Sequence, residues 1–258
     1  MEGLFKEGEI CLAYDEGNGY ISGGILPTKH SLALNTIPPL KSTFFGTERE
    51  IGIINLGQEG TISIDGSNYS MSYQEVLYIG RDAHNISFSS VDVKNPAVFY
   101  LNSLPATQFF DTQKITVQEI EHSKKLCADQ KSLTLIGNER VPSCQLKMGI
   151  VDVNSSTVQE EPASDSINNR DAVLLYFNIP QAKAVCHFMG EHEETRLLWL
   201  EAMQAVISPS WSIQSSTSLS DFSIVWGSSP VKPSKSSSIS TTNSTQKCYQ
   251  KSVDLAMT

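Results

Sequence analysis

The stretch Ala205–Ser215, AVISPSWSIQS, decides the fold of the C-terminal half. Its apolar start, Ala205-Val206-Ile207, predicts a buried strand, and Ser208-Pro209-Ser210 predicts a turn in which the proline fixes one φ angle. After Trp211 the chain is predicted to return as a second strand, which carries Ile213 and, at the rim, Gln214. The stretch is therefore predicted to form two strands joined by a tight turn.

The residues around this stretch also have the character of short strands. Apolar runs of four to eight residues alternate with glycine, proline and polar clusters, which is typical of a β-sandwich or barrel. The runs in this half cover residues 144–151, 172–178, 184–189, 195–200 and 222–227. They predict one β domain over residues 141–227.

The N-terminal half shows the same organisation. Residues 60–66, GTISIDG, alternate apolar and polar side chains at period two, and Asp65-Gly66 is a strong hairpin signal. Further short strands follow at near-regular spacing up to residue 102. The sequence thus predicts an all-β chain with two barrel-like domains, the first at residues 8–103.

Two segments depart from the strand pattern. Residues 104–140 are predicted to connect the domains and to contain one short helix within residues 116–129. Residues 228–258 are rich in serine, threonine and lysine, so they cannot form a packed core and are predicted to be a disordered tail.

The composition excludes several classes of protein. Of the 258 residues, 40% are hydrophobic and 18% charged, as in ordinary globular chains. The net charge of -9, with no basic stripe, argues against binding to nucleic acid.

No stretch reads as a signal peptide or membrane span, which predicts a cytoplasmic protein without a membrane partner. The five cysteines, with no CxxC pair, are predicted to be reduced thiols: Cys11, Cys127, Cys144, Cys186 and Cys248.

Four motifs give the chain a resemblance to a known family. They are TISIDG at residues 61–66, LYIG at 77–80, SCQLKMG at 143–149 and QAVISPSWSI at 204–213. Together they resemble the 5-keto-4-deoxyuronate isomerases, or 4-deoxy-L-threo-5-hexosulose-uronate ketol-isomerases, from about residue 8 to residue 227. The resemblance implies two tandem cupin domains, a homo-oligomer (usually a hexamer), and an aldose–ketose isomerisation in pectin and uronate breakdown.

The resemblance also implies one zinc ion in the C-terminal barrel, held by a His-x-His pair, a glutamate and a later histidine. Residues i and i+2 of a strand face the same side, so both imidazoles of such a pair reach the barrel interior. The corresponding positions here are Asp165, Ile167, Ala172 and Gln214. Only Asp165 could coordinate zinc as the family does, and the chain contains no His-x-His. We therefore expect no zinc cofactor.

Other residues are candidates for contact with a ligand. Arg196 could bind a uronate carboxylate in a bidentate manner, although an ion pair with a neighbouring glutamate is an equal alternative. Tyr176, Trp211 and Gln214 are candidates for the pocket wall, with plain core packing as the alternative for the two aromatic residues. His187 is interpreted as a structural histidine on a strand.

Three functional hypotheses remain open. The first, which we favour, is a non-catalytic family member whose barrels bind a uronate-type sugar and assemble into a homo-oligomer. The second is an active isomerase with a relocated or metal-free site; its base could come from Glu160, Glu161, Asp165 or Asp171, but no electrophile is evident. The third is a decaying copy without function.

Overall fold

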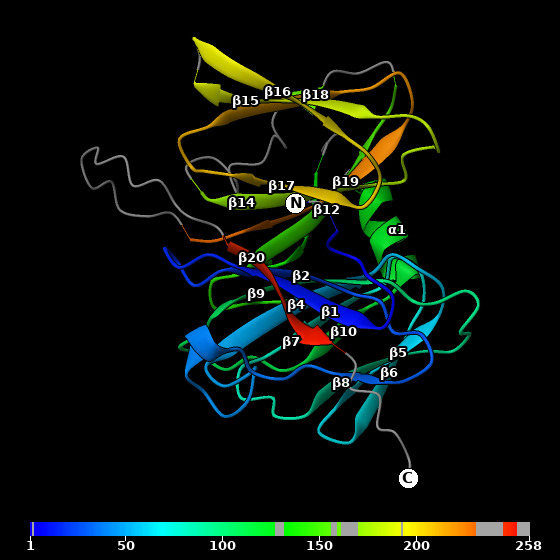
Figure 1. Cartoon of the computed structure of the whole chain (residues 1–258), viewed down its shortest axis with the longest axis vertical. Helices are drawn as coiled ribbons and strands as arrows, with labels where there is room; N and C mark the ends of the chain where they lie inside the picture. Colours follow the sequence, from blue (N-terminus) through cyan, green and yellow to red (C-terminus); the bar gives the residue numbers. More distant parts are fainter. Residues whose placement is uncertain are drawn as a thin grey trace. The chain divides into compact units, whose positions relative to one another are not determined.

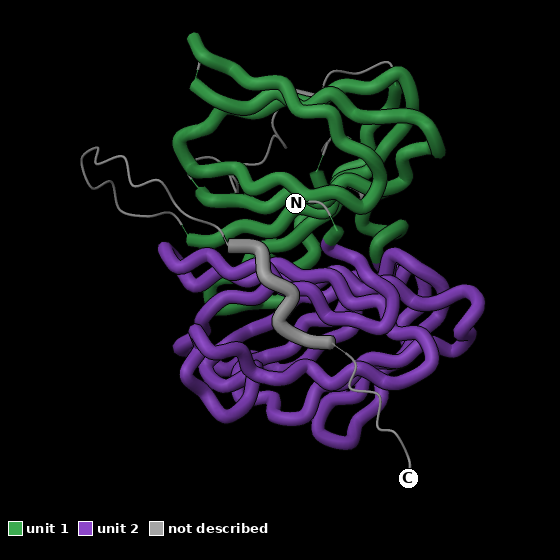
Figure 2. Tube along the Cα trace, in the orientation of Figure 1, with its two compact units in different colours: residues 1–3, 120–241 green, residues 4–119, 242–258 purple. Residues whose placement is uncertain are grey.

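The computed structural model describes residues 1, 3–126, 132–155, 159–160, 170–191, 193–230 and 245–251. Strands dominate these residues, and the fold is all-β as predicted. The chain forms two compact units (Figure 2). The N-terminal unit comprises residues 4–119 and 242–258, and the C-terminal unit comprises residues 1–3 and 120–241.

The N-terminal unit consists of two antiparallel sheets, with the short 3₁₀ helix η1 (Pro38–Leu40) beside them. The first has seven strands, in the order β10 (Gln113–Ile115), β7 (Val76–Ile79), β4 (Arg49–Asn55), β9 (Phe99–Pro105), β2 (Ile21–Ile25), β1 (Glu9–Tyr14) and β20 (Thr245–Lys251). The second has four, in the order β3 (Leu32–Ala33), β8 (Ile86–Ser90), β5 (Gly60–Ile64) and β6 (Ser67–Met71). Alternate apolar residues of both sheets, among them Ile53, Ile62 and Phe88, form one core.

The hairpin predicted at Asp65-Gly66 joins β5 to β6. Ile64 pairs with Ser67, and the two turn residues have φ angles of +47° and +89°. Positive φ at both central positions defines the two-residue turn whose twist matches paired strands. The prediction is confirmed.

The C-terminal unit also consists of two antiparallel sheets (Figure 1). The five-stranded sheet has the order β11 (Leu133–Ile136), β12 (Lys147–Val153), β19 (Phe222–Ser228), β14 (Ala172–Phe177) and β17 (Gln204–Ser208). The four-stranded sheet has the order β13 (Gln159–Glu160), β18 (Ile213–Thr217), β15 (Val185–Glu191) and β16 (Glu194–Leu200). Their facing sides enclose a second core that includes Leu174, Val206 and Trp226.

The short helix expected within the connector is α1 (Val117–Leu126). A capping box begins it: the backbone N–H of Thr116 donates to the Glu119 carboxylate at 2.7 Å, and that of Glu119 donates to the Thr116 hydroxyl at 3.4 Å. The rest of residues 104–140 is less of a linker than expected, because β10 and β11 each extend a sheet. No helix in the described part of the chain is long and apolar enough to cross a membrane.

The serine-rich tail differs in part from its predicted disorder. Residues 245–251 form β20, which pairs with β1 and has an irregularity between Ile10 and Leu12. Backbone pairing with a sheet edge needs no apolar core, and composition alone therefore does not reveal it. The remaining tail positions, 231–244 and 252–258, lie outside the described residues.

Candidate functional site

The stretch 205–215 forms the corner between the two sheets of the C-terminal unit. β17 pairs with β14 in one sheet, whereas β18 pairs with β15 in the other, so the two predicted strands do not pair with each other. Asp171 holds the turn, because its Oδ1 accepts the backbone N–H of Ser210 at 3.0 Å. The turn directs Trp211 outward, and its indole is 63% exposed instead of packed in the wall. Trp211 is therefore a surface residue of the corner.

Tyr176 and His187 connect the two facing sheets through the interior. Tyr176 lies on β14 and His187 on β15, and both side chains are buried. The phenol oxygen of Tyr176 lies 2.7 Å from Nδ1 of His187. The tyrosine ring also stacks on Phe222, with ring centroids 5.9 Å apart. This packing fixes the hydroxyl, and with it the orientation of the imidazole.

Gln214 shares this interior face. On β18 it pairs with Met189, and Ser216 pairs with His187, so the side chains of Gln214 and Ser216 lie on the same side as the imidazole. Gln214 is only 7% exposed. The Oε1 atom of Gln214 and the Nε2 atom of His187 are buried, and neither has a hydrogen-bond partner among the described residues. Buried polar atoms without partners are uncommon and point to a ligand or ordered water.

The interior pair is uncharged at neutral pH. Burial lowers the pKa of His187 to about 4, so its imidazole is neutral. Burial also raises the pKa of Tyr176 well above its ordinary value, against a smaller lowering effect of the Ser216 hydroxyl, so the phenol keeps its proton. Depending on the tautomer, Nε2 offers a donor or an acceptor, and the amide of Gln214 offers the complementary group. The site therefore suits a neutral group that both donates and accepts hydrogen bonds.

Arg196 lies at the rim of the same face. It pairs with Met189 on β15, which in turn pairs with Gln214 on β18, so Arg196, Met189 and Gln214 form one row across three strands. Arg196 is exposed, and no carboxylate in the described part of the chain forms an ion pair with it. The guanidinium is the cation of this row.

The described residues do not offer a zinc site at the positions that the resemblance implies. Ala172 begins β14, is buried in the core and carries no donor, and Gln214 offers only a neutral amide. Asp165 and Ile167 lie outside the described residues. Within the described ranges no three His, Cys, Asp or Glu side chains gather as a metal site would require.

Of the carboxylates considered as bases, only that of Asp171 belongs to the described side chains. The carboxylate of Asp171 holds the corner turn, and the side chains of Glu160, Glu161 and Asp165 lie outside what is described. The only titratable side chains that the structure brings together here are Tyr176 and His187, among the residues that it describes.

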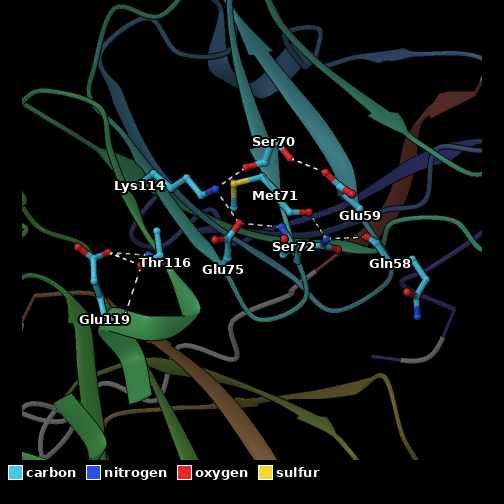
Figure 3. Close-up of polar contacts among 10 residues, drawn as sticks. Gln58, Glu59, Ser70, Met71, Ser72, Glu75, Lys114, Thr116 and Glu119 are labelled. Carbon is cyan, nitrogen blue, oxygen red and sulfur yellow. Dashed lines mark hydrogen bonds and ion pairs between the residues drawn. The ribbon is translucent and has the colours of Figure 1, made fainter. Parts of the chain in front are cut away.

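Another polar cluster, in the N-terminal unit, has a structural role (Figure 3). The ammonium group of Lys114 lies 2.7 Å from the Glu75 carboxylate and donates to the backbone carbonyl of Ser70 at 2.6 Å. The Ser70 hydroxyl donates to Glu59 at 2.8 Å, and the Glu75 carboxylate accepts the backbone N–H of Ser72. Lys114 is paired with Glu75, so the cluster fastens β10 to its neighbours.

The sequence interpretation missed His187 as a site residue. Tyr176 and Gln214 are named as pocket candidates from the sequence, whereas His187 is interpreted there as a structural histidine on a strand. A usable signal existed. Val185, His187 and Met189 share one strand face, so the histidine had to face the same core as the inward residues of the other sheet.

Two units, each built from two antiparallel sheets, give the chain a two-domain cupin-like fold. The cupin 2 conserved barrel domain protein from Leptotrichia buccalis matches with a TM-score of 0.51 and 11% identity, over 87% of this chain and 91% of that one. No family model matches the chain.

Curated relatives define the family. The 4-deoxy-L-threo-5-hexosulose-uronate ketol-isomerase of Formosa agariphila is 40% identical over 88% of this chain and 82% of that protein. The protein of the same name from Bacteroides fragilis is 33% identical over 88% of this chain and 82% of its own. The chain therefore belongs to the 4-deoxy-L-threo-5-hexosulose-uronate ketol-isomerase family.

Proposed function

We propose that this protein binds a uronate-type sugar in the interior of its C-terminal unit and does not carry out zinc-dependent isomerisation. One observation carries the proposal: two buried polar atoms, Nε2 of His187 and Oε1 of Gln214, have no partner among the described residues, on a face where Ala172 occupies the implied carboxylate position. In this proposal the interior keeps groups that can bind a sugar, whereas the positions of the implied metal ligands carry other residues.

The row of residues suggests how such a sugar would lie. A hydroxyl or carbonyl of the ligand would complete the hydrogen bonds of His187 and Gln214. The carboxylate would point to the rim, where Arg196 can bind it in a bidentate manner. A carboxylate would not be stable at the deeper position, since both interior groups are neutral and the described residues supply no cation there. The ligand is therefore bound in one orientation.

Catalysis by the family's reaction requires more than these groups. Moving a proton between two adjacent carbons needs a base and a group that stabilises the developing charge on the carbonyl oxygen. A second candidate, a metal-free isomerase, has one observation in its favour: the neutral His187 is oriented by Tyr176 and could act as the base. For the negative charge that develops on the carbonyl oxygen, the described interior offers only neutral hydrogen-bond donors. We therefore place this candidate second.

Self-association is part of the proposal. β16 is the terminal strand of its sheet, and its outer face exposes Leu197 (46%) and Trp199 (66%) next to Phe188 on β15. An open strand edge with an apolar face favours pairing with a second copy. Among the described residues, Cys11, Cys144 and Cys186 form no disulfide, and a reducing, cytoplasmic location is therefore part of the proposal.

The test measures binding and turnover separately. Calorimetry with the 5-keto-4-deoxyuronate should give saturable binding that Gln214→Leu or Arg196→Leu weakens at least tenfold, while Gln108→Leu, on the surface of the N-terminal unit, leaves it unchanged. NMR of the same mixture should show no ketose product. Formation of product at family-like rates would show instead that the protein is an active isomerase. Absence of binding would overturn the proposal.

A further inference from the structure

A hollow of about 350 Å³ lies on the outer face of the four-stranded sheet of the N-terminal unit. Ser63 on β5 and Ser87 on β8 pair with each other at its floor, and Ala33 on β3 pairs with Ser87. Their neighbours Ile62 and Phe88 are buried in the core, so alternation along each strand turns the serines to the opposite face. Three small side chains in a row leave the floor open.

An aromatic pair forms one wall. The rings of Phe44 and His84 stack with centroids 4.4 Å apart and an angle of 21° between their planes. The carboxylate of Asp65, in the β5–β6 hairpin, holds the histidine segment because it accepts the backbone N–H groups of His84 at 3.1 Å and Asn85 at 2.8 Å. The rings are thereby fixed beside the serine floor.

The segments that carry Leu34, Thr36 and Phe44 are also fixed by hydrogen bonds. The hydroxyls of Thr36 and Ser42 are 3.0 Å apart, and Ser42 donates to the carbonyl oxygen of Phe44 at 2.8 Å. The backbone N–H of Leu34 donates to the carbonyl of Ile86 at 2.8 Å. Since these hydrogen bonds order the lining before any ligand binds, binding costs little loop entropy.

The lining has one chemical character. It consists of hydroxyl and amide side chains, small or aliphatic residues and the two rings, and it includes no Lys, Arg, Asp or Glu. The hydroxyls of Ser63, Ser87 and Thr43 have no hydrogen-bond partner among the described side chains and backbone groups. An apolar ligand would leave these hydroxyls unpaired, and an anion would meet only the His84 imidazole. A sugar ring offers hydroxyls at its edge and a C–H face that can lie against aromatic rings.

We propose that this hollow, with Ser63 and Ser87 as its floor and Phe44 and His84 as its wall, binds one neutral sugar unit. The site lies within the N-terminal unit and is separate from the interior of the C-terminal unit. The protein would therefore hold a neutral sugar on its surface independently of any uronate.

Saturation-transfer NMR with methyl β-D-glucopyranoside and methyl β-D-galactopyranoside tests the proposal, with D-galacturonate as the anionic counterpart. We expect at least one neutral glycoside to bind with a dissociation constant of about 1 mM, a common strength for a ligand of this size, and the uronate to show no transfer that depends on this site. The double variant Ser63→Val/Ser87→Val fills the floor and removes both hydroxyls. It should abolish the signal while the circular-dichroism spectrum stays unchanged, because β-branched residues suit strands.

Thr61 and Ser89 supply the matched control. They pair on the same sheet face but do not line the hollow, so Thr61→Val/Ser89→Val should retain the signal. His187→Asn, in the C-terminal unit, should retain it as well, which separates this site from the uronate site. The proposal is overturned if neither neutral glycoside shows transfer, or if the floor variant binds as well as the unaltered chain.

Discussion

The phenol of Tyr176 meets Nδ1 of His187 at 2.7 Å across the interior of the C-terminal unit, and this contact ties one sheet to the other. It also determines which group remains for a ligand. With Nδ1 engaged, Nε2 is the free position of the ring, and it lies on the face that carries Gln214. A single hydrogen bond thus serves both the packing of the sheets and the polarity of the interior.

Removing the phenol oxygen tests its structural contribution. Tyr176→Phe keeps the ring stacked on Phe222 but leaves Nδ1 of His187 buried without its partner. We expect a loss of about 1–3 kcal/mol in the free energy of unfolding, measured by urea denaturation. Tyr69 is a half-buried tyrosine of the N-terminal unit and serves as the control. Tyr69→Phe should change the free energy of unfolding by less than about 0.5 kcal/mol. Equal effects of the two substitutions would refute this account of the contact.

The buried imidazole should make stability depend on pH. Burial lowers the pKa of His187 to about 4, whereas the ordinary value in an unfolded chain is about 6.5. Between these values the unfolded chain binds a proton that the folded chain does not, so stability is complete above pH ~6.5 and falls as the pH decreases towards ~4. The loss is on the order of 3 kcal/mol at most. Urea denaturation measures the free energy of unfolding at pH 7 and at pH 5. The decrease from pH 7 to pH 5 should be smaller for His187→Asn than for the unaltered chain.

The strands and the two-domain organisation were predictable because their signals are local. Period-two alternation, apolar runs and the Asp65-Gly66 turn each act within a few residues, and the capping box at Thr116 likewise marks the start of α1. The corner at Pro209 shows the limit of such signals. A turn motif predicts that the chain turns, but not that β17 and β18 join different sheets.

Only part of the candidate site was predictable, because sequence signals are local and the contact between the two sheets is not. Gln214 was found through the resemblance, whereas the importance of His187 depends on its distance from Tyr176, which is 11 positions away in sequence and on the facing sheet. Non-local contact between two sheets leaves no spacing motif in the sequence. Trp211 shows the converse, because a large aromatic residue beside a turn suggested packing, and the corner turned it outward.

Metal content tests the consequence of the replaced ligands. The purified chain should contain well under one zinc ion per molecule by elemental analysis. A chelator should leave its melting temperature unchanged, since only a ligand bound to the folded state stabilises it. Stoichiometric zinc, or a fall in melting temperature on chelation, would contradict the proposed loss of the site and would favour the isomerase.

The edge of β16 should determine self-association. Trp199→Thr removes the exposed indole from the outer face of that strand while it keeps a β-branched residue, and we expect a shift to smaller species in light scattering at micromolar concentration. Trp211→Thr is the matched control, because its indole is exposed to nearly the same extent, 63% against 66%, but lies at the corner. A monomeric unaltered chain, or equal effects of the two variants, would rule out this edge.

Restoring the implied ligands tests the residue correspondence itself. Asp165→His, Ile167→His, Ala172→Glu and Gln214→His together would supply three imidazoles and a carboxylate, a donor set that suits tetrahedral zinc. Without metal the variant should melt below the unaltered chain, because Ala172 is 1% exposed and a buried carboxylate is costly.

Zinc should then raise the melting temperature of the quadruple variant but not that of Ala172→Glu alone. We expect weak binding and little turnover, because four ligands alone do not supply the surrounding groups that orient imidazoles, and the lack of such groups typically costs about 10–100-fold in affinity or activity. If zinc stabilises the two variants equally, the correspondence of these four positions with the family's ligands is wrong. Turnover at family-like rates would instead mean that the interior around His187 and Gln214 has kept its complementarity to the family's substrate.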